Sequence, residues 1–152
     1  MKSRSFQKGR ELFGAAACAA CHRFNDEGGS FGPDLTGVVG RFSPHDLLES
    51  ILVPNKEVSD QYAPVVVTQK DGERITGRVV NLNNDTVMIS PNMFDPDELV
   101  SVDRRKVISM EPSKTSLMPE GLINTLKEEE ILDLLAYLLS RGDEKHAMFR
   151  RN

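Results

Sequence analysis

The sequence predicts a mainly α-helical protein that carries a small antiparallel β-rich insertion. Helical patterns occupy both ends of the 152-residue chain, and several short β patterns separated by tight turns lie between them. The β-rich segment, residues 57–112, lies between the second helix and the loop before the last helix. We expect residues 1–152 to form one domain that contains this insertion, because the residues outside 57–112 are numerous enough to form a compact core.

The first helix is expected near the N-terminus, within residues 5–17. Gly9 and Phe13 are four residues apart there and would share one face of the helix. Residues 26–41, DEGGSFGPDLTGVVGR, contain the Gly, Pro and Asp that are typical of a loop. The first part of the chain is therefore predicted to be a helix followed by a glycine-rich loop.

The second helix has clear ends in the stretch SPHDLLESILVP. Ser43 is a good N-cap, Pro44 suits the first helical position, and Asp46 stands three residues after the cap. Pro54 disfavours helical backbone at the residue before it. A short helix that ends before Pro54 is therefore expected.

The insertion contains five short runs rich in β-branched residues. Asp71-Gly72 is a strong hairpin signal between the first two runs. Five short strands joined by tight turns favour a small antiparallel sheet or barrel. The strands are expected within residues 63–82, 85–90, 98–102 and 106–110.

The last helix is predicted to begin at a capping box formed by Thr125 and Glu128. Leucine and isoleucine side chains then recur at helical spacing up to Leu139. Arg141 in the last turn and Gly142 just beyond it are typical of a helix C-terminus.

Composition argues against several classes of partner. The net charge of −4 and the lack of a long Lys/Arg run do not favour nucleic acid binding. No apolar run approaches the roughly 20 residues that span a bilayer. The N-terminus has basic residues but no apolar segment after them, so it lacks the pattern of a signal peptide.

Both cysteines of the chain lie in the stretch CAACH, residues 18–22. Two thiols at this spacing can add to the two vinyl groups of one haem, and the following His22 then lies under the iron as an axial ligand. The motif therefore indicates covalent attachment of one haem c through Cys18 and Cys21.

Other sites use the same residue types. A thioredoxin-type C-x-x-C opens a helix after a strand, whereas Cys18 and Cys21 follow a helix and lead into a loop. A tetrahedral zinc site would need a fourth ligand, and neither His45 nor His146 has helpful spacing for it. Two unlinked structural cysteines are the third alternative.

Together, the segments GRELF, CAACH, GPDLTGVVGR, LMP and LLAYL resemble class I cytochrome c. In that family the first helix crosses the last one. Gly9 and Phe13 would stand on one side of the crossing, and Leu134 and Tyr137 on the other. The resemblance covers the segments on both sides of the β-rich insertion and implies the cytochrome c fold with one covalently bound haem c.

The resemblance also implies the surroundings of the haem. The carbonyl of Pro33 would accept a hydrogen bond from Nδ1 of His22, which fixes the tautomer and raises the basicity of the ligand. Arg41 would neutralise a haem propionate. Met118, followed by Pro119, would supply the sixth ligand of the iron. The competing candidates for that position are Met88, Met93, Met110, Met148, His45 and His146.

The stretch at residues 46–80 is similar in particular to a haem-binding domain of planctomycetes and verrucomicrobia. That domain stands at the C-terminus of large secreted proteins, often after a β-propeller that resembles sugar or quinoprotein dehydrogenases. Haem is attached outside the cytoplasmic membrane, so the resemblance implies a periplasmic location. It also implies that this chain is an excised or processed domain, which would explain why no signal peptide is present.

We expect an electron-transfer domain and not an enzyme, with a redox protein or dehydrogenase domain as its partner. With His22 and Met118 both bound, the iron has no place for a substrate, and a thioether ligand raises the reduction potential. An open sixth position would instead make the chain a haem-based gas sensor or haem enzyme. The β-rich insertion could dock a partner, mediate self-association or cover the haem edge.

Overall fold

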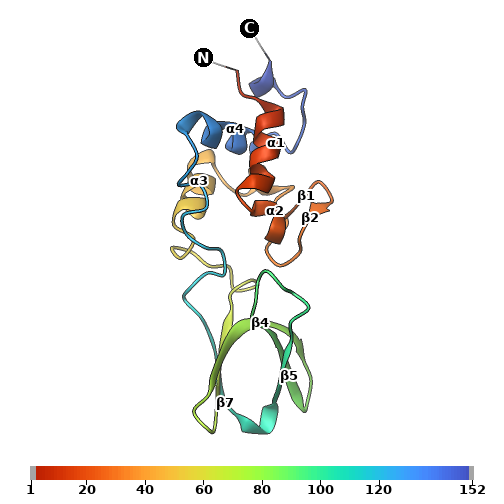
Figure 1. Cartoon of the computed structure of the whole chain (residues 1–152), viewed down its shortest axis with the longest axis vertical. Coiled ribbons are helices and arrows are strands. Elements are labelled where there is room, and N and C mark those ends of the chain that lie inside the picture. The colour runs from red at the N-terminus through yellow and green to blue at the C-terminus, as the bar shows by residue number, and fades with distance from the viewer. Residues whose placement is uncertain (1–2, 151–152) are drawn as a thin grey trace. The chain divides into compact units, whose positions relative to one another are not determined.

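The computed structural model describes residues 3–150 and divides into two compact units. The helical unit comprises the chain up to Pro54 and again from Pro119. The β unit comprises Asn55–Met118. Figure 1 shows the four α-helices in the first unit and a curved five-stranded sheet in the second.

The expectation of a mainly α-helical fold is wrong. The structure is 30% helical and 22% strand, and its larger sheet has five antiparallel strands. The physical reason is that the β-rich segment buries its own set of valine and isoleucine side chains and so supports a core. The helical patterns at the two ends of the chain give no hint of how substantial this sheet is.

Capping residues set the starts of the first helices. The hydroxyl of Ser5 accepts a hydrogen bond from the Lys8 amide at the start of α1, at 3.2 Å. The predicted cap of α3 is confirmed, because the hydroxyl of Ser43 accepts from the Asp46 amide at 3.1 Å and Pro44 is the first helical residue. The helical segments of residues 3–150 are α1 (Phe6–Ala15), α2 (Cys18–Cys21), α3 (Pro44–Leu52) and α4 (Glu128–Leu139), with 3-10 turns η1 (Val38–Gly40), η2 (Arg104–Lys106) and η3 (Ala147–Phe149).

The last helix begins differently from the prediction. The capping box expected at Thr125 and Glu128 is wrong, since α4 starts only at Glu128. The carboxylate of Glu130 instead accepts a hydrogen bond from the amide of Lys127, at 3.0 Å. The residues before it form a turn that buries the side chain of Ile123, and this burial outweighs the local capping preference.

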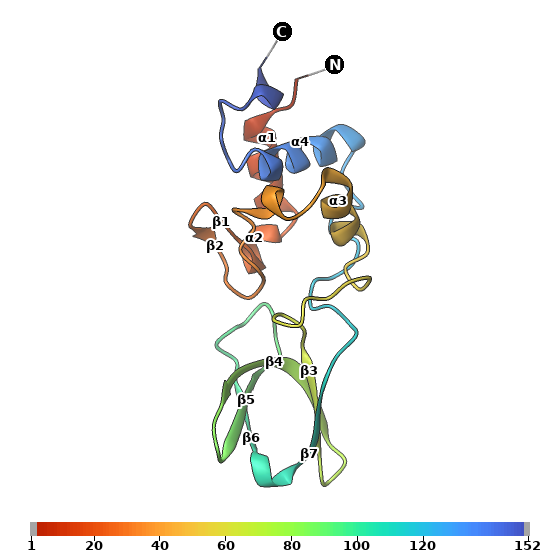
Figure 2. The ribbon, with the colours of Figure 1, turned by 180° about the vertical axis from the view of Figure 1, so that it is seen from behind.

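Helices α1 and α4 cross in direct contact, as both views of the ribbon show (Figures 1 and 2). A Cβ at Gly9 would collide with the carbonyl oxygen of Asp133 and lie 2.7 Å from the Cβ of Tyr137. Only glycine therefore allows the two backbones to approach so closely. The ring of Tyr137 packs against Phe6 and Phe24, with centroids 5.3 and 4.9 Å away.

The β unit is built on one strongly arched strand, β4. Its first half pairs with β3, where Gly77 faces Val65, and its second half pairs with β5, where Arg78 faces Ser90. The strand order is β6-β5-β4-β3-β7, and Figure 2 shows how the sheet curls around its interior. The strands are β3 (Val65–Gln69), β4 (Arg74–Leu82), β5 (Thr86–Ser90), β6 (Val100–Asp103) and β7 (Val107–Pro112).

The core of the β unit consists of Val67, Val87, Ile89 and Val102, all nearly inaccessible to solvent. They alternate with outward-facing residues along their strands, as a sheet with one buried face requires. The five predicted strands are thus present. A second, two-stranded hairpin, β1 (Arg23–Phe24) with β2 (Glu27–Gly28), lies in the helical unit and was not predicted.

Candidate functional site

The two cysteines occupy the short helix α2 and are not joined by a disulfide. Burial raises the pKa of the Cys18 thiol to about 11 and also raises the pKa of Cys21. Both groups are therefore protonated thiols at neutral pH. A thioredoxin-type site instead lowers the pKa of its cysteine, so the structure does not favour that alternative.

His22 follows α2 directly, and its backbone amide donates to the carbonyl of Cys18 at 2.9 Å. Its Nδ1 lies 2.7 Å from the carbonyl oxygen of Pro33. Because a carbonyl can only accept, this bond places the proton on Nδ1 and leaves the Nε2 lone pair for a metal. Burial lowers the pKa of His22, against the opposing effect of the bond to Pro33, which favours the neutral imidazole that a metal needs.

A loop of three glycines wraps closely around the C-x-x-C-H segment. A Cβ at Gly28 would collide with the carbonyl of His22, and a Cβ at Gly29 with that of Ala20. A Cβ at Gly32 would lie 2.8 Å from Cε1 and 3.0 Å from Nδ1 of the His22 ring. The sequence marked this loop by its glycines, but the dependence of the His22 ring on Gly32 was missed because it rests on a contact across a turn.

Amide hydrogen bonds hold the same loop in place. Gly29 donates to the carbonyl of Ala19 at 2.9 Å, and Gly32 donates to the carbonyl of Cys21 at 2.8 Å. These bonds satisfy carbonyls at the end of α2 that the helix itself leaves open. The orientation of the His22 ring is therefore fixed by its own backbone, by Pro33 and by the tight fit of the loop.

Arg41 and Met118 are the two remaining predicted site residues. The guanidinium of Arg41 is exposed and donates to the carbonyl oxygen of Asp34 at 3.0 Å, close in sequence to Pro33. Met118 is half-buried and is the last residue of the β unit, where its amide donates to the hydroxyl of Ser116 at 3.1 Å. Its position relative to His22 stays a prediction.

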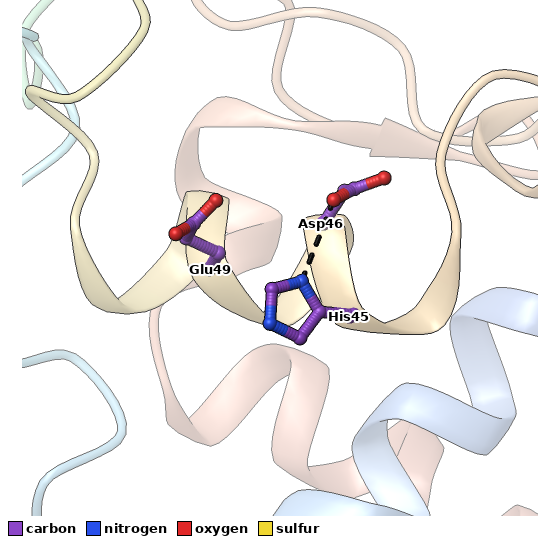
Figure 3. A group of neighbouring side chains, drawn as sticks. All are labelled: His45, Asp46 and Glu49. Atoms are coloured by element: carbon purple, nitrogen blue, oxygen red, sulfur yellow. Dashed lines mark hydrogen bonds and ion pairs between the residues drawn. The ribbon is translucent and has the colours of Figure 1, made fainter.

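A different cluster of metal-binding residue types lies on α3 (Figure 3). The side chains of His45, Asp46 and Glu49 lie close together, with their possible ligand atoms within 4.8 Å of one another. The Nδ1 of His45 is 3.5 Å from a carboxylate oxygen of Asp46. The Asp46 carboxylate also accepts from the hydroxyl of Ser43, so it already serves the start of the helix. Within residues 3–150 this is the only such cluster, and it includes neither cysteine, so no zinc set gathers around Cys18 and Cys21.

The donor set at the C-x-x-C-H segment fits a covalently bound haem. It offers two free protonated thiols at the required spacing and a neutral imidazole whose Nε2 is available. Such a set, at the end of a helix and opposite a Gly-Pro loop, belongs to the class of c-type haem proteins. The family model described as "Cytochrome c" matches residues 6–85 of the chain, which is more than half of its 152 residues.

The chain therefore belongs to the cytochrome c family. Members of this family carry covalently bound haem c, and the chain is a haem-binding electron-transfer domain. A search of curated proteins found no match. Within residues 3–150, no helix combines the length and apolar character that a membrane span requires.

Proposed function

We propose that the chain is a periplasmic cytochrome c domain that carries one electron at a time and takes it from an attached or partner dehydrogenase. In this proposal Cys18 and Cys21 hold the haem, and His22 and Met118 are the axial ligands. The bound haem supplies a reversible Fe(III)/Fe(II) couple. The observation that carries the proposal is the hydrogen bond from Nδ1 of His22 to the carbonyl of Pro33, because it presents Nε2 as a fixed, basic ligand.

The remaining residues would support this role electrostatically and sterically. Because Gly32 has no side chain, its backbone lies close against the His22 ring, and this close contact leaves the ring little freedom to rotate. Arg41 would pair with a haem propionate, in addition to its bond to the carbonyl of Asp34. Pro119 follows Met118 and restricts the backbone of the loop that would hold the sulfur against the iron.

An absorption spectrum of the haem-loaded protein tests the proposal. We expect a low-spin haem c spectrum in both redox states, a weak far-red sulfur-to-iron band when oxidised, and no change on adding CO to the reduced form. Met118→Ala should lose the far-red band and bind CO, whereas Met93→Ala, which truncates another half-buried methionine, should do neither. A high-spin spectrum or ready CO binding by the unaltered protein would favour a gas sensor or haem enzyme instead.

The parent architecture is also part of the proposal. A planctomycete-type domain at the end of a larger secreted oxidoreductase would receive electrons from a dehydrogenase domain that precedes it. The similarity of residues 46–80 to that subfamily supports this assignment. Electron transfer from a dehydrogenase fused to or mixed with the chain would support it, and failure of every periplasmic dehydrogenase of the same host to reduce the haem would count against it.

The β unit would serve docking or self-association. In the described sheet β6 and β7 are the edge strands, and Ile108 on β7 is 63% exposed. Sedimentation of the isolated chain would show whether copies associate. Deleting residues 57–112 should abolish reduction by the partner while leaving the haem spectrum intact if the unit docks a partner, and should instead shift the reduction potential if it shields the haem.

A further inference from the structure

The two ends of the β unit run side by side. At the base of the sheet Val65 on β3 faces Pro112 on β7, and the amide of Ser113 donates to the carbonyl of Pro64 at 2.7 Å. The chain that leaves the sheet after β7 therefore returns along the chain that entered it. This returning segment is the one that carries Met118.

One side chain ties the two segments together. The Oδ1 of Asn55 accepts a hydrogen bond from the backbone amide of Ser116 at 2.7 Å, across 61 positions in the sequence. The hydroxyl of Ser116 in turn accepts from the amide of Met118 at 3.1 Å. Two hydrogen bonds in series thus run from Asn55 to the backbone of Met118, and Pro119 restricts that backbone from the other side.

We propose that Asn55 is a positioning residue for Met118, an inference that rests on the proposed role of Met118 as an iron ligand. A thioether is a neutral and weak donor, so the fraction of time it stays bound depends on how narrowly its loop is held. The bond from Asn55 fixes the backbone two residues before Met118, and the Ser116 hydroxyl fixes the amide of Met118 itself. Without the Asn55 side chain the segment keeps its connection to β7 and the bond from Ser113 to Pro64, but it loses the hydrogen bond that holds it at Ser116.

The test compares Asn55→Ala with Asn55→Asp in the full haem-loaded chain. Asn55→Ala removes the acceptor and should lose most of the far-red sulfur-to-iron band, lower the reduction potential and allow CO to bind the reduced protein. It should also raise the amide hydrogen exchange rate of Ser116 at least tenfold. Asn55→Asp keeps an oxygen acceptor at the same place and should retain the band and the slow exchange.

Asn92→Ala is the matched control. Asn92 also accepts a backbone hydrogen bond within the β unit, from the amide of Phe94 at 3.0 Å, but it lies in the loop before β6. We expect it to leave the band, the potential and the exchange of Ser116 unchanged. An equal loss of the band in Asn92→Ala would overturn the inference, because general loosening of the β unit would then explain the effect.

The outcomes separate this inference from the proposal beneath it. If the unaltered protein lacks the far-red band, Met118 is not the ligand and the proposed function fails at that point. If the unaltered protein shows the band and Asn55→Ala keeps it, the positioning role alone is refuted. If Asn55→Ala does not fold, Ser116→Ala is the alternative variant: it removes the bond from the Met118 amide to the Ser116 hydroxyl but leaves the backbone amide at position 116 bonded to Asn55. A full far-red band in Ser116→Ala would then refute the proposal that these two hydrogen bonds position Met118.

Discussion

Replacing Gly32 with alanine should displace the imidazole of His22 without altering any proposed ligand. The new Cβ would lie 2.8 Å from Cε1 and 3.0 Å from Nδ1 of the ring. Carbon atoms in favourable contact stand about 3.5–4.0 Å apart. The ring or the loop must therefore move by roughly 0.7 Å or more to reach such a distance, and the backbone of Gly32 is itself held by its amide bond to the carbonyl of Cys21.

This displacement acts on the bond between Nδ1 of His22 and the carbonyl of Pro33, now 2.7 Å long. Losing a neutral hydrogen bond costs about 1 kcal/mol, which for a one-electron couple corresponds to at most roughly 40 mV, since a tenfold change is 59 mV. Lower basicity of the imidazole destabilises Fe(III) more than it destabilises Fe(II). The reduction potential of Gly32→Ala should therefore rise, by up to that amount.

Potentiometric titration of the haem-loaded variant measures the shift, with the haem content checked by its absorbance. Gly37→Ala is the control, because nothing lies within 4 Å of a Cβ at Gly37 and its φ of −98° suits any residue. The reasoning is refuted if Gly32→Ala holds a full complement of haem at an unchanged potential. It is equally refuted if Gly37→Ala shifts the potential by the same amount.

Three further predictions concern stability and charge. Gly9→Ala should lower the free energy of unfolding by about 1–3 kcal/mol, because the new Cβ overpacks the crossing of α1 and α4. Gly14→Ala should raise it by up to about 1 kcal/mol, because its Cβ meets nothing within 4 Å. Urea unfolding of the two variants measures both changes in the free energy of unfolding. Val67→Ala, at a fully buried site, should cost the β unit about 2 kcal/mol, seen in its unfolding transition, while the spectrum of the bound haem stays unchanged. Arg105 lowers the pKa of Asp103 from its ordinary 3.8 to about 2. The stabilisation from this pair is therefore fully present at pH values above 3.8 and is lost as the pH falls through about 2. Arg105→Ala should return the pKa of the Asp103 carboxyl, measured by NMR titration, toward 3.8.

Local sequence signals predicted the elements that local interactions determine. Ser43 and Pro44 place the start of α3 because the cap is formed within four residues. Asp71-Gly72 separates β3 from β4 for the same reason, with Gly72 at a φ of +89°. The Thr125 capping box failed because burial of Ile123 is a tertiary contribution that no local pattern reveals.

The prediction of a mainly α-helical fold was wrong for a related reason. Each β run is short, and none alone shows whether the sheet can bury enough apolar surface to stand as a unit. That depends on the arch of β4, which brings Val67 and Ile89 from different hairpins into one core. Such a core is visible only once the strand order is known.

In the candidate site, too, the features that depend on neighbouring residues could be predicted from the sequence, and those that depend on distant residues could not. C-x-x-C-H is legible because its ligands are adjacent in the sequence, and the Gly-Pro loop was placed by resemblance. The fit of Gly32 against the His22 ring and the bond from Asn55 to Ser116 join residues across a turn and across 61 positions. No spacing rule connects such pairs, although both act on residues that the motif had already singled out.

The way in which the β unit joins the chain bears on how its deletion must be interpreted. Removing residues 57–112 spares Asn55 and Ser116 but removes the pairing of β3 with β7 that brings their segments together. A shift in potential after that deletion could therefore arise from a loosened Met118 segment and not from exposure of the haem. Adding Asn55→Ala to the deletion resolves this, because it should produce no further shift if the sheet had been holding the segment. A further shift would show that the bond forms without the sheet, and any change caused by the deletion alone would then reflect shielding.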